Sequence, residues 1–107
     1  MNVITNDPAN CEKAFGSLYG VYDPEIGLNV IDLGLIYQID FMEEEKRVET
    51  RMTLTTRFCP MGESITNNVT RSLSDTFAHF QVHVNLVFDP PWNASRISER
   101  GRQFLNR

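Results

Sequence analysis

The fold is decided by the stretch GLIYQIDFMEEEKRVETRMTLTT, residues 34–56. Apolar and polar side chains alternate on both sides of a charged turn at residues 43–46. One face carries Leu35, Tyr37, Ile39 and Phe41 before the turn and Val48, Thr50, Met52, Leu54 and Thr56 after it. Alternation with a period of two is typical of half-buried β-strands. The stretch therefore predicts a β-hairpin whose apolar face must be covered by another element.

The segment that follows the hairpin supplies this cover. Its apolar residues recur at every third or fourth position: Ile65, Val69, Leu73, Phe77 and Phe80. This spacing predicts an amphipathic helix that opens after Cys59-Pro60 and packs on the hairpin. A third strand follows, in which apolar residues alternate again: Val82, Val84, Leu86 and Phe88. It ends at Pro90-Pro91, because proline cannot donate a hydrogen bond to a β-ladder.

Two further helices flank these elements. Asp7-Pro8 predicts the start of a helix over about residues 8–20, because Asp7 can cap exposed amides and Pro8 fits the first turn. Its buried face comprises Cys11, Phe15, Leu18 and Tyr22. A last helix is expected near the end of the chain, capped by Asn93 or Ser95. Its inner side carries Ile97, Gly101, Phe104 and Leu105.

The order helix, strand, strand, helix, strand, helix predicts an α+β two-layer sandwich, with helices packed on a small three- to four-stranded sheet. The 107 residues suit a single domain, residues 1–107. No apolar run approaches the roughly 20 residues of a membrane helix, and residues 1–9 contain no basic residue for a signal peptide. A net charge of -4 argues against nucleic-acid binding. We therefore expect a cytoplasmic protein that binds neither membranes nor nucleic acids.

Cys59-Pro60 is the dipeptide that most strongly indicates chemistry. The predicted helix opens here, so we expect Cys59 at or near its N-cap, where unpaired amides and the helix dipole stabilise a thiolate. Thr55, Thr56 and Arg57 add hydroxyl donors and a positive charge. Such a thiolate is both a nucleophile and a ligand for soft metals. The alternative is a buried thiol that fills space, which is the role expected of Cys11.

Two other segments carry candidate site residues. Asp23-Pro24-Glu25, followed by Asn29 and Asp32, places carboxylates on a loop, where they can bind a metal, act as acid and base, or cap a turn; taken alone, the segment favours the turn. Trp92 follows two prolines and either plugs the edge of the sheet or covers a pocket. His79 and His83 lack the spacing of a metal site. The standard enzyme motifs are absent from the sequence.

Together these residues resemble the iron-sulfur assembly family once catalogued as domain of unknown function 59, which includes the SufT and PaaD proteins. The resemblance covers residues 15–105 and rests on VYDPE at 21–25, NVIDLGLIY at 29–37, MTLTT at 52–56, Cys59-Pro60 and Pro90-Pro91-Trp92. It implies an α+β domain that helps mature iron-sulfur proteins, with Cys59 as the reactive or cluster-related residue and Asp23 as the acid of the shared motif. PaaD has a further cysteine cluster, whereas this chain has no cysteine after Cys59.

The leading hypothesis is therefore an iron-sulfur assembly or targeting factor, an accessory protein rather than an enzyme, in which the Cys59 thiolate bonds transiently to metal, sulfur or a client. Asp23 and Glu25 are its candidate metal ligands, and Thr55, Thr56 and Trp92 are candidate residues around a bound cofactor. One thiolate is fewer than the four that usually hold a cluster. The cargo is therefore iron or a cluster held transiently, with further ligands from a client, a small thiol or a second subunit.

The expected partners are the iron-sulfur assembly machinery or apo client proteins, and a homodimer is the commonest assembly for such a domain. A second hypothesis is a protein-binding adaptor in which Cys59 is structural and the acidic first half of the chain docks a partner. A third is a small cysteine-dependent enzyme, which requires a base beside Cys59; only His79 and His83 are candidates for that base.

Overall fold

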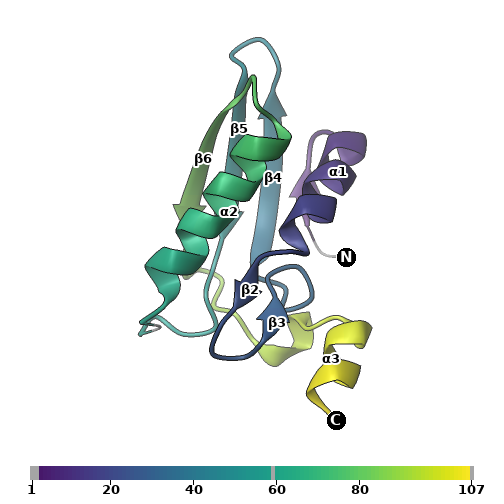
Figure 1. Ribbon diagram of the computed structural model, residues 1–107, viewed down its shortest axis with the longest axis vertical. Coiled ribbons are helices and arrows are strands. Elements are labelled where there is room, and N and C mark those ends of the chain that lie inside the picture. Colours follow the sequence, from purple (N-terminus) through teal and green to yellow (C-terminus); the bar gives the residue numbers. More distant parts are fainter. Residues whose placement is uncertain (1–2, 59, 107) are drawn as a thin grey trace.

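The computed structural model describes residues 3–58 and 60–106 (Figure 1). In chain order its elements are β1 (Ile4–Thr5), α1 (Pro8–Leu18), β2 (Tyr22–Asp23), β3 (Leu28–Asn29), β4 (Ile36–Met42), β5 (Arg47–Met52), α2 (Gly62–Thr76), β6 (Gln81–Leu86), the 3-10 helix η1 (Ala94–Arg96) and α3 (Glu99–Leu105). The predicted order of helices and strands is confirmed. The two-residue strands β1, β2 and β3 are additions to it.

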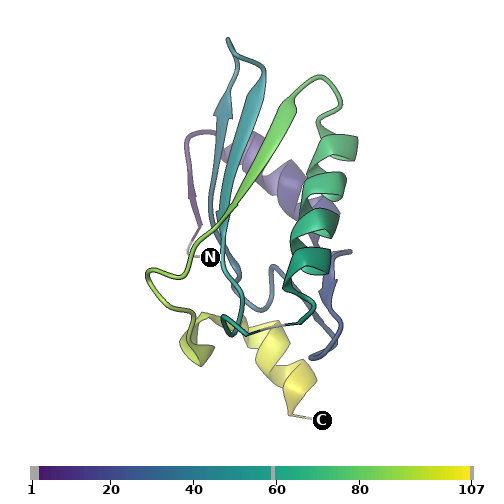
Figure 2. The same ribbon diagram turned by 90° about the vertical axis from the view of Figure 1, so that its left-hand side faces the viewer.

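The main sheet has the strand order β1-β4-β5-β6, and β2 and β3 form a separate small hairpin. β4 and β5 pair antiparallel, as the predicted hairpin requires. β1 pairs parallel with β4, and β6 pairs parallel with β5. Parallel strands need a long crossover connection, and here each crossover contains a helix, α1 or α2. Both helices lie on the same face of the sheet (Figures 1 and 2).

The core lies between the two helices and the sheet. Ile65, Val69 and Leu73 of α2 are buried, at the spacing expected from the sequence. They share one core cluster with β5, where Val48, Thr50 and Met52 are buried on alternate positions. The predicted α+β two-layer architecture is therefore confirmed. No helix among the described residues is long and apolar enough to cross a membrane.

The predicted alternation of β4 is wrong at its start. The register between β4 and β5 shifts between Ile36 and Gln38, which marks a bulge. Ile36 is consequently buried, whereas Tyr37, which was expected on the inward face, is only half-buried. The hydroxyl of Tyr37 donates to the carbonyl of Pro90 at 2.8 Å. A bulge inserts one extra residue into a strand and so changes which side chains face inward. A strictly alternating pattern in the sequence does not reveal this insertion.

Some helix ends and caps differ from those predicted. α1 begins as predicted, since the Asp7 carboxylate accepts from the amide of Asn10 at 3.2 Å. Tyr22 lies beyond this helix, in β2, and is 53% exposed. α3 is capped by Ser98, whose side chain accepts from the amide of Gly101 at 3.0 Å. Asn93 caps η1 instead, so the chain makes an extra turn before the last helix.

Candidate functional site

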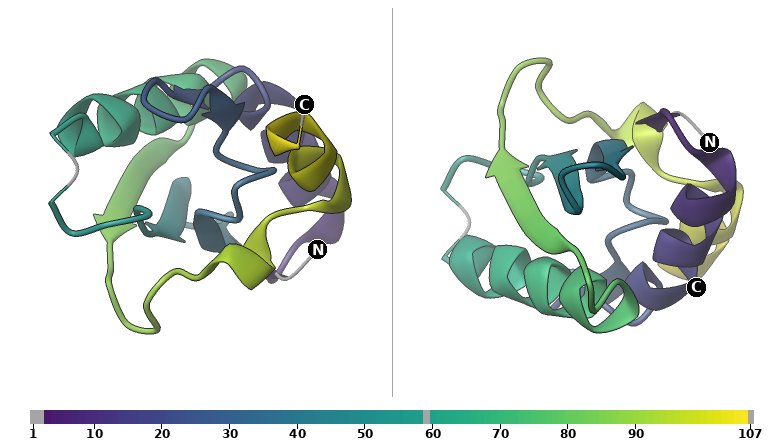
Figure 3. Two further views of the ribbon diagram at one scale, coloured as in Figure 1. Left: turned by 90° about the horizontal axis from the view of Figure 1, so that it is seen from below. Right: turned by 90° about the horizontal axis from the view of Figure 1, so that it is seen from above.

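Most of the predicted site residues lie at one end of the molecule. β5 and β6 run parallel, so the loops that follow them leave the sheet at the same end. The β2–β3 hairpin, η1 and α3 lie at this end too (Figures 1 and 3). We call it the loop end, comprising residues 22–29, 53–58, 60–61 and 87–105. The segments that carry Asp23, Glu25, Thr55, Thr56 and Trp92 are therefore brought together, although they are far apart in the sequence.

Cys59 itself lies outside the described residues, but its neighbours correct one expectation. The N-cap of α2 is Met61 and the helix begins at Gly62, so Pro60 precedes the helix. No side chain caps α2 at Met61, while Glu63 lies in the first turn, where a negative charge is favourable. The helix thus begins later than the Cys-Pro dipeptide indicated.

Loop residues on both sides of Cys59 are exposed. The Phe58 side chain is 88% exposed, and the amide of Phe58 donates to the hydroxyl of Thr56 at 3.2 Å. Thr56 therefore shapes a local turn, and Thr55 before it is half-buried. A cavity of about 400 Å³ lies beside this loop. Its lining comprises Leu54, Arg57, Gly62, Glu63, Thr66, Asn67, Leu86 and Phe88.

Arg57 is the positive charge of this loop. Its guanidinium lies over the ring of Phe88, 4.9 Å from the ring centroid, and so links the loop after β5 to the loop after β6. A cation held over an aromatic face is a favourable contact. The positive charge expected before Cys59 is thus held against the loop that follows β6.

Asp23 has a structural role in the β2–β3 hairpin. It is 2% exposed, and its carboxylate accepts from the amide of Glu25 at 2.9 Å. Its carbonyl accepts from the amides of Ile26 at 3.2 Å and Gly27 at 2.7 Å. These bonds close the turn between β2 and β3, which is the role that the segment favoured when taken alone. Glu25 is exposed at the same turn. A metal-binding role for Asp23 and Glu25 stays a prediction.

Trp92 fixes the loop after β6. Its indole Nε1 donates to the carbonyl of Leu33 at 2.7 Å, and the ring is half-buried against the core. Indole rings commonly combine apolar packing with one hydrogen bond of this kind. The contact joins residues 59 positions apart in the sequence. Trp92 therefore anchors the C-terminal segment, and its contribution to a cofactor site stays a prediction.

The sequence grouped Asn29 and Asp32 with the carboxylates at Asp23, but it did not predict the buried polar cluster centred on Asp32, which is 4% exposed. Its carboxylate accepts from Asn29 Nδ2 and from Ser98 Oγ, both at 2.7 Å. Arg100 donates to the same carboxylate through Nε at 3.2 Å and Nη2 at 3.0 Å. The only signal in the sequence was the close spacing of Asn29 and Asp32, because Ser98 and Arg100 are more than 60 residues away.

Both burial and hydrogen bonding act on Asp32. Burial raises the pKa of its carboxyl, but the hydrogen bonds from Asn29, Ser98 and Arg100 outweigh burial and hold the pKa below its ordinary value. The carboxylate therefore stays ionised and fully hydrogen-bonded. Arg100 also lies over the ring of Tyr19, at 5.0 Å, so the cluster connects α3 to the end of α1. The observed contacts of the Asp32 cluster are structural, because they attach α3 to segments much earlier in the chain.

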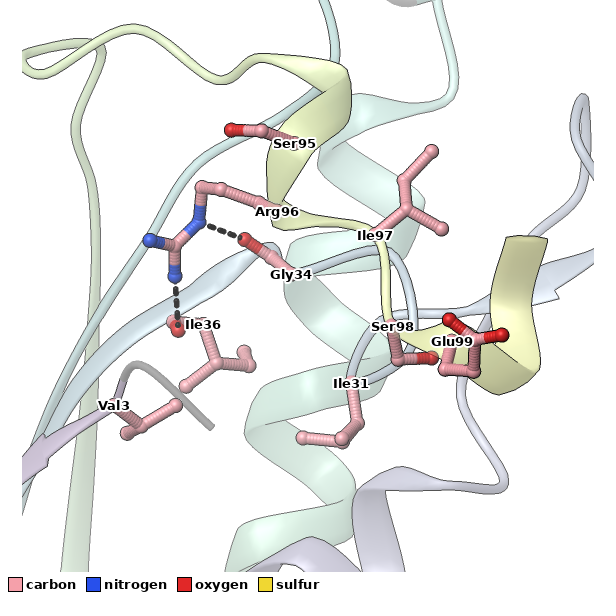
Figure 4. A pocket seen from close by; sticks show the side chains of 9 residues that line it. All are labelled: Val3, Ile31, Gly34, Ile36, Ser95, Arg96, Ile97, Ser98 and Glu99. Carbon is pink, nitrogen blue, oxygen red and sulfur yellow. Dashed lines mark hydrogen bonds between the residues drawn. The ribbon is translucent and has the colours of Figure 1, made fainter.

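Arg96 makes a second attachment of the same segment (Figure 4). Its Nε donates to the carbonyl of Gly34 at 2.7 Å and its Nη2 to that of Ile36 at 3.3 Å. The guanidinium also lies 4.4 Å from the centroid of Tyr37. A cavity of about 350 Å³ lies between η1 and β4, beside these contacts. The visible role of Arg96 is to bind η1 to the start of β4.

The histidines lie away from the loop that contains Cys59. His79 is in the turn after α2, and the 15 residues of that helix, about 22 Å in length, separate it from Pro60 and Met61. His83 is exposed in the middle of β6. Within residues 3–58 and 60–106, no group of three or more His, Cys, Asp or Glu side chains is arranged to hold a metal ion.

The fold and the order of these motifs match a known family. The family model for iron-sulfur cluster assembly proteins matches residues 12–86, from α1 to the end of β6. This range contains Asp23, Glu25, Thr55, Thr56 and Cys59, while Trp92 lies beyond it. The chain belongs to the iron-sulfur cluster assembly protein family.

Named relatives and a solved structure agree with this assignment. The chain is 36% identical over 87 residues to the Fe-S protein maturation auxiliary factor YitW of Bacillus subtilis, covering 81% of this chain and 84% of that protein. It is 36% identical over 78 residues to the Fe-S protein maturation auxiliary factor SufT of Staphylococcus aureus, covering 73% and 88%. A crystal structure of domain of unknown function DUF59 from Bacillus anthracis superposes with a TM-score of 0.85 at 32% identity, covering 92% and 93%.

Proposed function

We propose that this protein is an auxiliary factor in the maturation of iron-sulfur proteins and that the thiolate of Cys59 is its reactive group. The observation that carries the proposal is the match of residues 12–86 to the iron-sulfur cluster assembly family. Two relatives that share more than a third of their aligned residues are named Fe-S protein maturation auxiliary factors. The partners proposed from this are the iron-sulfur assembly machinery or apo client proteins.

The surroundings of the loop support a reactive cysteine. Arg57 precedes Cys59 by two positions, and the unpaired amides of the α2 N-terminus begin three positions after it. A positive charge and a helix N-terminus both favour a thiolate over a thiol. Exposed Phe58 and Met61 leave the neighbouring loop open to a partner. These features suit a cysteine that bonds transiently to iron, sulfur or a client.

Iron or a cluster is the cargo in this proposal. A single thiolate binds iron or a cluster weakly, because protein-bound clusters usually have four thiolate ligands. Further ligands would come from a client, a small thiol, or Asp23 and Glu25. Carboxylate oxygens are harder ligands than thiolates, so they suit iron better than sulfur-rich clusters. Weak binding favours transfer of the iron or cluster over its storage.

The test is a Cys59→Ser variant compared with a Cys11→Ala variant in cells that depend on this protein. Cys11 is a buried core residue, so Cys11→Ala controls for the loss of a thiol without touching the loop. Activity of an iron-sulfur client enzyme is expected to fall about tenfold or more with Cys59→Ser, since removal of a nucleophile abolishes its bond. It should be retained with Cys11→Ala.

Folding and partner binding are measured on the same variants. Circular dichroism and co-purification with the assembly machinery are expected to be unchanged in Cys59→Ser. Full client activity in Cys59→Ser would overturn the reactive role. With partner binding intact, that result would favour an adaptor whose cysteine is structural.

A further inference from the structure

β6 is an edge strand without the usual protection. It is the last strand in the order β1-β4-β5-β6, and its outer edge is open in the view that faces it (Figure 2). Its sequence, QVHVNL, contains no charged residue and no proline. Its pairing with β5 is continuous from Gln81 to Leu86, with no bulge. Edge strands that must stay unpaired normally carry charges, prolines or bulges, so the properties of β6 favour pairing with another strand.

The backbone groups available on this edge follow from the register. Gln81 donates its amide to Lys46 and Val87 donates its amide to Met52, at 2.7 and 2.8 Å. In a parallel ladder every second residue faces the same neighbour. The backbone amides and carbonyls of residues 81, 83, 85 and 87 therefore point toward β5. Val82, Val84 and Leu86 turn their amides and carbonyls toward the open edge.

We propose that β6 pairs antiparallel with β6 of a second copy of this chain, about a two-fold axis at Val84. Val84 then faces its own counterpart, and Val82 faces Leu86 of the second copy on the side that carries the helices. On the other side His83 lies opposite Asn85. A two-fold interface must be self-complementary. This register meets that requirement, because no two like charges are opposed and the valines and leucine extend the apolar layer.

The flank of α2 above this edge is compatible with the same arrangement. Thr66 lines a cavity together with Leu86, so this flank lies on the β6 side, and Thr70 follows one turn later. Their hydroxyls donate within the helix, to the carbonyls of Gly62 at 2.8 Å and Thr66 at 2.9 Å. Thr66 and Thr70 therefore offer methyl groups on this flank, and Glu63 places one charge at its N-terminal end. Two copies of α2 would lie side by side over a continuous sheet.

The pairing keeps the two loop ends apart. Antiparallel strands related by a two-fold axis point in opposite directions, so the loop after β5 in one copy lies on the other side of the axis from its counterpart. Each copy would carry its own candidate site. The dimer is thus independent of the proposed role of Cys59, and either proposal can fail without the other.

Sedimentation equilibrium of the wild-type protein over a dilution series tests the proposal. The expected mass at high concentration is twice the 12.3 kDa of one chain. Two variants, H83K/N85K and H83E/N85E, each place like charges opposite one another at both symmetric positions. Each should weaken self-association about tenfold or more. Mixed in equal amounts, the two variants should associate with each other, because opposite charges then face one another.

Hydrogen exchange on the wild-type protein provides a measurement that does not depend on the variants folding. The amides of Val82, Val84 and Leu86 should exchange more slowly as the protein concentration rises. A wild-type protein that stays a monomer at every concentration would overturn the proposal. So would a dimer that both variants leave unchanged, or protection of these three amides only when a client protein is added.

Discussion

Burial sets the chemistry of Cys11. The thiol is 6% exposed in α1, and burial raises its pKa above the ordinary value, outweighing a hydrogen bond with Thr5 that lowers it. Only the thiolate is strongly nucleophilic, so a raised pKa and restricted access both slow its reactions. Cys11 is therefore the internal reference against which the second thiol of the chain can be compared.

We expect iodoacetamide to modify Cys59 at least about tenfold faster than Cys11 at neutral pH, in the folded protein without metal. The rates are measured at several pH values by mass spectrometry of peptides from the two sites. The same measurement in denaturant is the control, where the two rates should converge. Equal rates in the folded protein would contradict an activated thiolate at Cys59.

Residue types at the loop end could be identified from the sequence, but their partners could not. Asp23 was a candidate ligand or turn residue, and its recorded contacts are those of a turn. Trp92 was expected to plug the edge of the sheet or to cover a pocket, and its hydrogen bond to the carbonyl of Leu33 shows which segment it anchors. The Asp32 cluster joins segments more than 60 residues apart, which no local pattern encodes.

At the scale of elements, the long periodic segments were predictable and the short ones were not. α1, α2 and the β4–β5 hairpin repeat their apolar positions often enough to show a period. β1, β2 and β3 have two residues each, too few to show one. β1 depends on pairing with the distant β4, whereas β2 and β3 pair with each other across a short turn. The late start of α2 after Pro60 likewise depends on the loop before it rather than on the helix pattern.

Gly34 illustrates how closely two elements approach. Its φ of 74° lies in the left-handed region, and a Cβ there would stand 2.4 Å from the carbonyl oxygen of Arg96. A side chain at this position would strain the backbone, because of the positive φ, and would collide with a backbone atom. Gly34 thus allows η1 to lie directly on the turn before β4.

Gly34→Ala should lower the free energy of unfolding by about 2 kcal/mol or more, measured by chemical denaturation. The matched control is Gly16→Ala in α1, where a Cβ meets no atom within 4 Å. That substitution should raise stability by about 0.5 to 1 kcal/mol, because alanine favours a helix interior over glycine. Similar effects of the two substitutions would contradict the close approach of η1.

At the scale of the whole molecule, the C-terminal segment is held to the remainder by polar contacts. Asp32 binds Ser98 and Arg100, Arg96 binds the carbonyls of Gly34 and Ile36, and Trp92 binds that of Leu33. They attach η1 and α3, which lie across the loop end in the view from below (Figure 3). The ionised carboxylate of Asp32 therefore contributes to the stability of the folded state.

The pH dependence of stability follows from this. A carboxyl whose pKa is lower in the folded state stabilises that state above its unfolded pKa of about 3.9, and the stabilisation is lost as the pH falls through the folded pKa. Asp32→Asn should cost about 1 to 3 kcal/mol at neutral pH, since it leaves charged and polar donors without a carboxylate. Its stability should also fall less steeply than that of the wild type below about pH 4.

The measurement is urea denaturation at several pH values, followed by the fluorescence of Trp92, the single tryptophan of the chain. Asp75→Asn, at an exposed position on α2, controls for the loss of one negative charge. An acid profile for Asp32→Asn that matches the wild type would show that the cluster does not couple stability to pH.

The β4–β5 turn has a practical consequence. Residues 43–46 are exposed and lie at the end of the molecule opposite the loop end (Figure 1). An affinity handle inserted there would attach the protein to a surface with its candidate site facing solution. The same handle fused after α3 would stand at the loop end, among the groups whose reactivity is to be measured.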